Sequence, residues 1–416
     1  MRSSQLDRYK PGRLRLSALA LSAMLIVAAC GGSAASPNPA VPAIFAGRSP
    51  VAATATPTAT SVPTPSPNLT PALAAAPCLA GSAEGPFLSR SGTQITCAGH
   101  AVLLTGYTFY PALLGGSKAW HRPDFKTYID HVLDMGAAAG QNLIRPTDQW
   151  DKHTAGQTAD DPVVWANMDY LLQAARNRGM FVVIDLSAYR WLLMSHGSDP
   201  TKASAWNTFI TGVAARYRDN PAVAFYSIAG EPTPPRTAAE MQTLVAFYRS
   251  TTEALRAADP NHLITAGGFN HMEDEPPGVD WWQAIDALPD NDIVGVKTYS
   301  QKDLDLMPAI AEYGTSVNRP VVDEEFGMPQ GFGDASFAGR SAYNGLATGR
   351  APFFRDVYTI GKSLGFSGFV VWNMGCEMGT GSYEVSPLTP SAWSAVKDNG
   401  AIATPEGVGE TVPLCS

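Results

Sequence analysis

The sequence predicts an α/β fold, a (β/α)8 or TIM barrel preceded by a short N-terminal β-hairpin, and three observations support this prediction. A chain of 416 residues with 45% apolar and 9% aromatic content can bury a large core. From Leu103 onward, short β-branched or aromatic runs alternate with amphipathic stretches of helical length, as in parallel sheets with crossover helices. Eight such units follow one another, and no Gly-x-Gly-x-x-Gly follows the first run, so a barrel is favoured over an open dinucleotide-binding sheet.

Residues 1–29 have the composition of an export signal. Basic residues precede the apolar run from Leu16 to Ala29, which is short for a membrane span. The stretch from Leu25 to Gly31 resembles the lipobox of bacterial lipoproteins, which implies that Cys30 is lipidated and forms the new N-terminus. We therefore expect an extracytoplasmic protein, lipid-anchored to the cell membrane through Cys30. The alternative is an ordinary secretory signal with an incidental cysteine.

Residues 30–77 are predicted to be a flexible linker. They are almost entirely Ala, Pro, Ser, Thr and Gly, and Arg48 is their one charged side chain. Such a composition buries too little apolar surface to offset chain entropy. Residues 78–416 then form the folded domain. The formal charge of −8 argues against a nucleic-acid partner, and we expect a monomer.

Four cysteines follow Cys30, an even number that makes disulfides plausible in an exported protein: Cys78, Cys97, Cys376 and Cys415. Three pairings are possible. We favour Cys78 with Cys97, because both flank the short segment before the barrel, and Cys376 with Cys415 would then hold the C-terminal tail. Free buried thiols are the alternative. Because no close Cys/His spacing appears, neither a metal nor a cofactor is expected.

Local patterns place the individual elements. A hairpin around Ser91-Gly92 is expected to pair Phe87–Ser89 with Thr93–Thr96, where it could plug the barrel floor. The eight expected strands are Val102–Leu104, Asn142–Arg145, Phe181–Leu186, Val223–Ile228, His262–Ala266, Ile293–Val296, Pro320–Asp323 and Gly368–Trp372. The helices are expected near Phe125–Met135, Trp165–Arg178, Ala205–Tyr217, Ala238–Ala257, Trp281–Leu288, Leu304–Tyr313, Phe354–Leu364 and Ser391–Lys397. Four glycines are expected to end helices, where a residue that tolerates positive φ is favoured: Gly136, Gly179, Gly314 and Gly365.

Two of the expected strands end on a carboxylate. The fourth strand leads into Gly230-Glu231-Pro232, and the seventh leads into Glu324-Glu325-Phe326-Gly327. The active site of a barrel lies at the C-terminal ends of its strands, and strands four and seven face each other across the mouth. Retaining hydrolysis of a glycosidic bond requires one protonated and one ionised carboxyl group about 5 Å apart.

These motifs resemble clan A glycoside hydrolases, and glycoside hydrolase family 5 in particular, which contains cellulases and β-mannanases. The resemblance covers roughly Leu103 to Trp393. It implies a retaining β-glycosidase that acts on β-mannan or β-glucan outside the cell, with Glu231 as acid/base and Glu325 as nucleophile. Strand alternation favours Glu325 over Glu324, because Asp323 and Glu325 share one face and Glu324 takes the other.

Further family positions carry over singly. The resemblance implies that Arg145 pairs with the nucleophile and keeps it ionised, and that the hydroxyl of Tyr299 orients it. It implies that Trp372 forms the aromatic floor under the cleaved sugar. Trp150, like other tryptophans expected in loops after strands, could line a neighbouring subsite; those others are Trp120, Trp191, Trp281 and Trp282. Core packing is the alternative for each aromatic residue.

Three positions depart from the family pattern: Gly230 replaces Asn, Ser187 replaces His, and Lys297 replaces His. A glycine at position 230 would leave room for an amide side chain. Lys297 either supplies the lost donor to the substrate or pairs with Glu324 or Asp323. Two other functions remain open, namely a barrel that binds glycan but cleaves poorly, and a metal-dependent hydrolase on the same fold.

Overall fold

The structure, a computed structural model, describes residues 78–79, 87–110, 116–147, 149–150, 161–187, 200–269, 281–331, 349–375 and 382–402. All of them lie in one unit, Ser66–Ser416. Cys30, Cys376, Cys415 and Trp191 lie outside these residues, so the signal, the linker and the proposed tail disulfide stay predictions. Within the described ranges, no helix is both long and apolar enough to cross a membrane.

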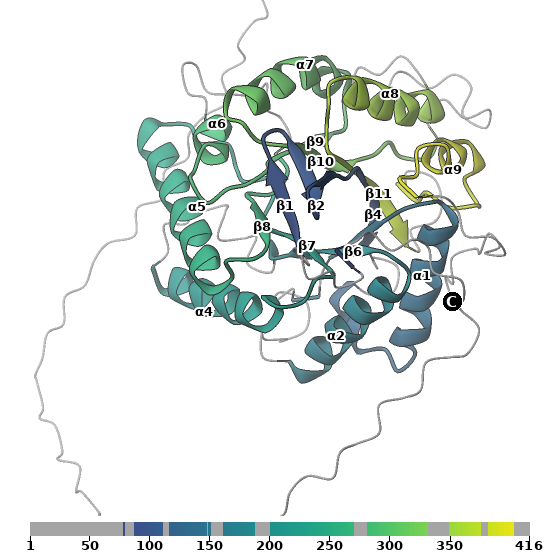
Figure 1. Cartoon of the computed structure of the whole chain (residues 1–416), viewed down its shortest axis with the longest axis horizontal. Coiled ribbons are helices and arrows are strands. Elements are labelled where there is room, and N and C mark those ends of the chain that lie inside the picture. Colours follow the sequence, from purple (N-terminus) through teal and green to yellow (C-terminus); the bar gives the residue numbers. More distant parts are fainter. Residues whose placement is uncertain are drawn as a thin grey trace, which may run out of the picture. The chain divides into compact units, whose positions relative to one another are not determined.

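Eight parallel strands form the predicted barrel. Their order in the sheet is β8-β7-β6-β5-β4-β11-β10-β9, and isolated bridges from Thr265 to Ile293 and from Phe269 to Val296 connect β8 with β9. Figure 1 looks down this barrel and shows the strands inside a ring of helices. The strands are β4 Leu104–Tyr110, β5 Leu143–Pro146, β6 Phe181–Asp185, β7 Val223–Ser227, β8 Leu263–Thr265, β9 Val294–Thr298, β10 Val321–Phe326 and β11 Gly368–Gly375.

Each predicted helix is present, with its ends shifted by a few residues. The helices are α1 Phe125–Ala138, α2 Pro162–Asn177, α4 Pro200–Tyr217, α5 Ala238–Ala258, α6 Trp281–Asp286, α7 Gln301–Ser316, α8 Arg350–Ser363 and α9 Pro390–Lys397. A 3-10 helix, η2 Gly116–His121, was not predicted. α7 begins earlier than expected because Ser300 caps it: the Ser300 hydroxyl accepts a hydrogen bond from Asp303 N.

The first strand is the largest boundary error. The apolar run Val102–Leu104 suggested a strand there, but β4 begins at Leu104 and continues to Tyr110. Its polar members Thr105 and Thr108 are fully buried, so tertiary burial outweighs the weak sequence pattern. The consequence for the site is that Tyr110 lies at the C-terminal end of a barrel strand.

Two of the four predicted glycine caps are wrong. Gly179 and Gly365 have positive φ values of 72° and 82°, as expected. Gly136 and Gly314 instead lie inside α1 and α7. At Gly136 a Cβ would be 2.2 Å from a ring carbon of Tyr107, so this glycine lets the helix pack closely on the barrel.

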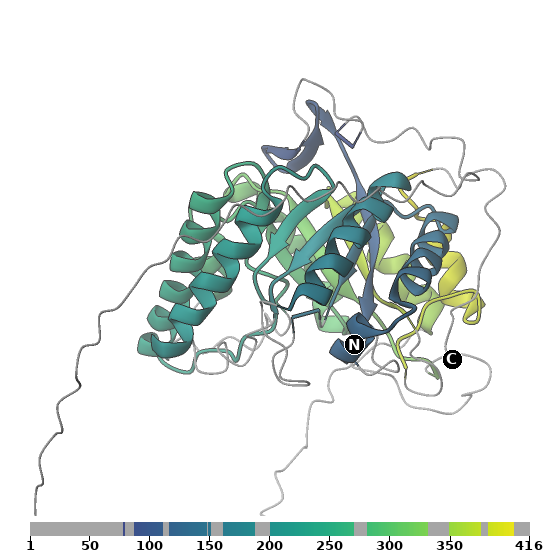
Figure 2. The same cartoon turned by 90° about the horizontal axis from the view of Figure 1, so that it is seen from below.

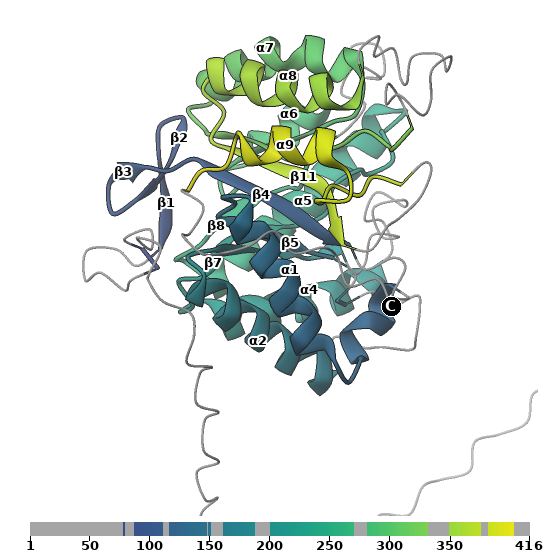
Figure 3. The same cartoon turned by 90° about the vertical axis from the view of Figure 1, so that its right-hand side faces the viewer.

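The N-terminal hairpin covers the barrel floor, as predicted. It consists of β1 Leu88–Ser91 and β2 Gln94–Cys97, and a short third strand, β3 His100–Ala101, pairs with β2. Figures 2 and 3 show this hairpin at one end of the barrel. Arg90 pairs with Asp292, which precedes β9, at 3.1 Å, so the hairpin meets the N-terminal ends of the strands.

The favoured disulfide is present. Cys78 and Cys97 are joined with an S–S distance of 2.07 Å, and both cysteines are fully buried. Because Cys97 ends β2, the bond attaches the start of the domain to the floor hairpin. The disulfide therefore lies at the floor of the barrel, at the end opposite to the C-terminal ends of the strands.

Candidate active site

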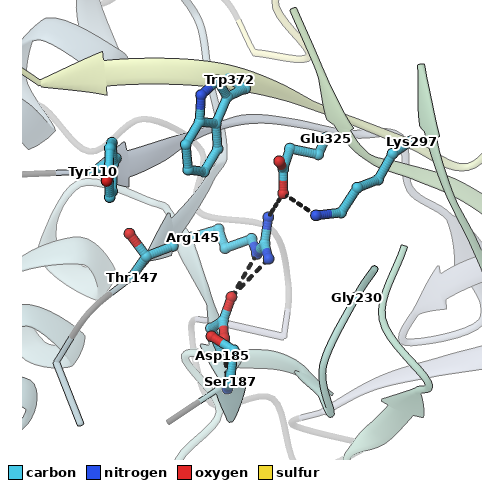
Figure 4. Close-up of a pocket in the computed structure, with 9 residues that line it drawn as sticks. All are labelled: Tyr110, Arg145, Thr147, Asp185, Ser187, Gly230, Lys297, Glu325 and Trp372. Atoms are coloured by element: carbon cyan, nitrogen blue, oxygen red, sulfur yellow. Dashed lines mark hydrogen bonds and ion pairs between the residues drawn. The ribbon is translucent and has the colours of Figure 1, made fainter. Parts of the chain in front are cut away.

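A polar pocket of about 200 Å³ opens at the C-terminal ends of the strands. Figure 4 shows its lining, with an aromatic pair on one side and Lys297 near Gly230 on the other. Nine residues line it: Tyr110, Arg145, Thr147, Asp185, Ser187, Gly230, Lys297, Glu325 and Trp372. Four of these were selected from the sequence for their charge or ring, and Gly230 and Ser187 were noted for their departure from the family pattern.

Glu325, the last residue but one of strand β10, is surrounded by donors. Its Oε2 is 2.5 Å from Nη1 of Arg145 and 2.6 Å from Nζ of Lys297. Its Oε1 accepts a hydrogen bond of 2.7 Å from the hydroxyl of Tyr299. Both carboxylate oxygens are thus fixed, and the contacts of Arg145 and Tyr299 are those that the family resemblance implied.

These donors set the charge of Glu325. Burial alone would raise the pKa of Glu325, but Lys297 and Arg145 together lower it to about 2. Burial, and then the nearby Glu325 charge, raises the pKa of Tyr299 well above its usual range. Around neutral pH, an ionised carboxylate therefore faces the pocket and a neutral phenol donates to it.

Arg145, on β5, is held on both sides. Its Nε and Nη2 lie 2.9 and 2.7 Å from Oδ2 of Asp185, and its Nη1 contacts Glu325. Asp185 ends β6 and also accepts a hydrogen bond of 2.8 Å from Ser187 N. The buried guanidinium therefore bridges two carboxylates from β6 and β10, which fixes its position at the base of the pocket.

The alternation argument that separated Glu324 from Glu325 is wrong, although the two residues do differ. Between β10 and β9, Asp323 pairs with Val296 and Glu325 pairs with Lys297, so two residues on β10 oppose one on β9. This β-bulge adds one residue and changes the facing of the strand. Glu324 therefore points into the barrel interior beneath the site, where Ser227 and Thr265 donate to it at 2.8 and 2.7 Å.

Glu231 follows β7 in a left-handed backbone conformation, with φ of 58°. Its backbone N–H donates to Gly268 O at 3.2 Å, and Ala229 N–H donates to Ala266 O at 3.0 Å. These bonds continue the pairing of β7 with β8 beyond the strand ends. The carboxylate of Glu231 reaches the same ammonium as Glu325, with Oε1 3.3 Å from Nζ of Lys297.

Lys297 pairs with carboxylates that the sequence alternatives did not name. The ion pairs that the structure shows for it are to Glu325 and Glu231, whereas the pairing alternative named Glu324 or Asp323. The other alternative, a contact with the substrate, stays a prediction. Its side chain is only 4% exposed. Because β9 pairs Lys297 with Glu325 across the bulge, the lysine side chain leaves the strand toward the pocket.

Gly230 does not leave an empty space. A Cβ at position 230 would lie 2.5 Å from Gly268 O and 2.9 Å from Cε of Lys297. At Gly268, a Cβ would lie 2.6 Å from Cγ of the same lysine. The two glycines thus border the space that the Lys297 stem fills, and the expectation that Gly230 vacates room for an amide side chain is wrong.

Two aromatic residues form one wall of the pocket. The rings of Tyr110 and Trp372 are 4.9 Å apart and inclined by 32°. Trp372 lies within β11, which continues past it to Gly375, and its peptide bond to Asn373 is cis. The predicted strand ended at Leu104, whereas β4 ends at Tyr110. Tyr110 was therefore not recognised from the sequence as an aromatic residue at a strand end.

Trp150 does not line the pocket and is removed from the candidate site. It is 4% exposed, and its ring packs on Trp165 and Phe209 at 5.4 and 5.5 Å. The other described tryptophans that we had considered as subsite residues are also buried in the core: Trp120, Trp281 and Trp282. Core packing, the alternative for each of them, accounts for their positions.

Asp185, Thr147 and Tyr110 are site residues that sequence reasoning did not select. The signal for Asp185 was its position at the end of the third predicted strand, and Thr147 directly follows β5. In the part of the chain that the structure describes, no group of three or more His, Cys, Asp or Glu side chains could hold a metal ion. The charged side chains of the pocket instead form ion pairs with one another.

Comparison with known proteins agrees with this geometry. The family model for cellulase, glycosyl hydrolase family 5, matches residues 101–338, more than half of the chain. The chain belongs to glycosyl hydrolase family 5. It is therefore a β-glycoside hydrolase of the mannanase or cellulase type. The matched range includes β4 to β10 and thus both candidate carboxylates.

Family 5 relatives include several mannanases. The probable mannan endo-1,4-beta-mannosidase C of Aspergillus terreus is 28% identical over 316 residues, which cover 60% of this chain and 76% of that protein. The crystal structure of the endo-1,4-beta-mannanase from Rhizomucor miehei has a TM-score of 0.58 at 16% identity and covers 76% of this chain and 99% of its own. The mannanase from Thermotoga petrophila has a TM-score of 0.54 at 15% identity, over 72% and 76% of the two chains. These structural likenesses identify the fold.

Proposed function

We propose that this chain is a retaining glycosidase that cleaves β-1,4-linked mannan, with Glu325 as nucleophile and Glu231 as acid/base. The observation that supports this most directly is that one ammonium, that of Lys297, contacts both carboxylates. The two contacting oxygens are therefore at most about 6 Å apart, close to the separation in retaining enzymes and below that in most inverting ones.

In the first step, a carboxylate oxygen of Glu325 bonds to the anomeric carbon while the bond to the leaving oxygen breaks. Glu231 gives its proton to that leaving oxygen. In the second step, Glu231 takes a proton from water, the water oxygen bonds to the anomeric carbon, and Glu325 is released as a carboxylate. The low pKa of Glu325, about 2, suits a group that must be ionised when substrate binds.

Mannan is the first substrate to test, because the curated relatives are named as mannan endo-1,4-beta-mannosidases. β-Glucan is the second, since the family model is that of cellulases. The ring pair of Tyr110 and Trp372 offers an apolar face on which the C–H face of a sugar can stack.

The decisive experiment compares reducing-end release from β-mannan, β-glucan and xylan, with the anomeric configuration of the first product followed by NMR. We expect release from mannan and a product that keeps the β configuration. An α product would contradict the assignment of Glu325 as nucleophile. Saturable mannan binding without release would instead favour the weakly active glycan-binding barrel.

We also propose that the enzyme acts outside the cell, held at the membrane by lipid on Cys30. The support is the lipobox-like stretch from Leu25 to Gly31 and the linker composition of residues 30–77. Metabolic labelling with a fatty acid should mark the full-length protein and fail with Cys30→Ser. Cys78→Ser is the control for loss of a cysteine, and it should remain labelled. Equal labelling of the Cys30→Ser protein would contradict the anchor.

A further inference from the structure

Lys297 is the one lysine among the pocket-lining residues, and its side chain is almost fully buried between two reacting groups. The stem lies against the backbone of Gly230 and Gly268, where a Cβ on either glycine would overlap it. The packing of the stem therefore fixes the position of the ammonium. It is 2.6 Å from Glu325 and 3.3 Å from Glu231, so it is closer to the nucleophile but within reach of both.

We propose that Lys297 is a further catalytic residue, whose ammonium pairs mainly with Glu325 before the reaction and with Glu231 once Glu325 carries the sugar as an ester. This inference rests on the proposed function and extends it. It assigns to one side chain the change of Glu231 from acid to base between the two steps.

In the free enzyme, the negative charge of Glu325 opposes ionisation of Glu231, while Lys297 favours it. Because Lys297 is closer to Glu325, much of its charge is balanced there. Glu231 can then hold the proton that the leaving oxygen needs.

After the first step, Glu325 is a neutral ester. The ammonium no longer has that charge beside it, and its 3.3 Å contact with Glu231 becomes its stronger carboxylate contact. Glu231, which has given up its proton, is now stabilised as a carboxylate and can accept a proton from water. The cation does not form or break a covalent bond, so the atoms and electrons of both steps balance as described above.

Other charged groups face this ammonium from each neighbouring strand. Arg145 on β5 contacts Glu325 and Asp185, and Glu324 lies beneath on β10, close enough for Lys297 to favour its ionised form. Arg145 is already held between Asp185 and Glu325. Lys297 is therefore the cation placed to respond to Glu231.

The test replaces Lys297 by Met, which keeps the length of the stem and removes the charge. With a manno-oligosaccharide, whose leaving oxygen needs a proton, both limbs of the pH profile of kcat/KM should move upward by roughly one pH unit, because both carboxylates lose a cation. A dinitrophenyl β-mannoside, whose leaving group needs no proton, then tests the second step. Breakdown of the glycosyl-enzyme at neutral pH should slow by roughly tenfold, which appears as a burst of dinitrophenolate. Azide, which attacks without a general base, should remove most of that delay.

Lys362→Met is the matched control. Lys362 is an exposed lysine on α8 that bonds to Asn399 and does not line the pocket, and its loss should leave both limbs and the burst unchanged. A Lys297→Met enzyme with a uniformly lower kcat/KM, unmoved limbs and no burst would overturn the proposal. If this variant does not fold, Lys297→Gln is judged by the same criteria.

A titration without turnover separates this inference from the proposed function. Carboxyl NMR of the free protein should show Glu325 titrating near its pKa of about 2 in the natural protein and at higher pH in Lys297→Met. Equal titration in both proteins overturns the role of Lys297. Absence of glycosidase activity in the natural protein, with a shifted titration, would overturn the proposed function alone.

Discussion

Two adjacent glutamates on β10, one at the mouth of the barrel and one in its interior, have pKa values that are shifted in opposite directions. Glu325 faces Arg145 and Lys297 at the mouth, and although burial opposes it, these cations lower its pKa to about 2. Glu324 lies one residue earlier among the hydroxyls of Ser227 and Thr265, and burial raises its pKa above the usual value. Both carboxyl groups are buried to a similar degree. The comparison teaches that the partners, rather than burial, decide in which direction the pKa of each glutamate moves.

The largest expected effect is the loss of the charged glutamate. Glu325→Gln keeps the shape of the side chain but cannot form the glycosyl ester, so mannan hydrolysis should fall by at least about a thousand-fold. Glu324→Gln, its neighbour and matched control, should retain most activity, because the amide oxygen can still accept from one of the two hydroxyls, those of Ser227 and Thr265, and the amide N–H can donate to the other. Measurement of kcat for both variants decides the point, and an active Glu325→Gln enzyme would refute the nucleophile assignment.

A second effect at the mouth should depend on the leaving group. Glu231→Ala removes the proton donor, so hydrolysis of mannan should drop by roughly a hundred-fold to ten-thousand-fold. Cleavage of a dinitrophenyl β-mannoside to the glycosyl-enzyme should be nearly spared, since that leaving group needs no proton. Azide should then accelerate turnover of the dinitrophenyl substrate and yield a β-glycosyl azide. Equal losses for both substrates would argue against the acid/base role.

Removal of the Arg145 guanidinium, which bridges Asp185 and Glu325, should reduce the stability of the folded protein. Arg145→Met leaves Asp185 and Glu325 buried with one partner fewer, so we expect a loss of about 3–5 kcal/mol in the free energy of unfolding, measured in urea. Arg216→Met is the control, because the pair of Arg216 with Asp169 is exposed by more than 40% on each side. That exposed pair should contribute less than about 1 kcal/mol. Similar losses in the free energy of unfolding for both variants would mean that the buried ion pairs of Arg145 stabilise the fold no more than the exposed pair of Arg216 does.

The smallest effect concerns the pH dependence of stability, which sharpens the contrast between Glu324 and Glu325. The pKa of Glu324 is raised in the folded state, so its contribution is fully present below its ordinary value of 4.5 and declines as the pH rises through the folded value. Glu324→Gln cannot lose a proton and should lose less stability than the natural protein as the pH rises.

The pKa of Glu325 is lowered, so its contribution is present above 4.5 and is lost as the pH falls toward 2. Urea unfolding of the natural protein and Glu324→Gln from acid to neutral pH checks the sign for Glu324. Parallel profiles would show that Glu324 ionises alike in the folded and unfolded chains.

Much of the fold could be read from the sequence because its signals are local. Apolar runs and helical periodicity located eight strand and helix pairs, and Ser91-Gly92 located the floor hairpin. Strand ends also directed attention to Glu231 and Glu325. Where a signal was weak, as in the mixed polar and aromatic β4, the boundary was missed together with Tyr110.

The contacts across the barrel depended on information that the chain does not hold locally. The bulge on β10 turned Glu324 inward, and alternation along a regular strand cannot foresee an added residue. Trp150 follows a strand like a site residue, but the helices α2 and α4 bury it through Trp165 and Phe209.

The sequence by itself determined the residue types and the order of the elements: eight βα units, a carboxylate after the fourth and seventh strands, and a lysine on the sixth. Only the tertiary structure decided where the ammonium of that lysine lies. Closure of the barrel brings β7, β9 and β10 together, and the glycines at 230 and 268 let the Lys297 stem pass between the loops. Its ammonium then lies between two carboxylates, 66 and 28 residues away along the chain, because contact across a barrel depends on register and closure rather than on sequence separation.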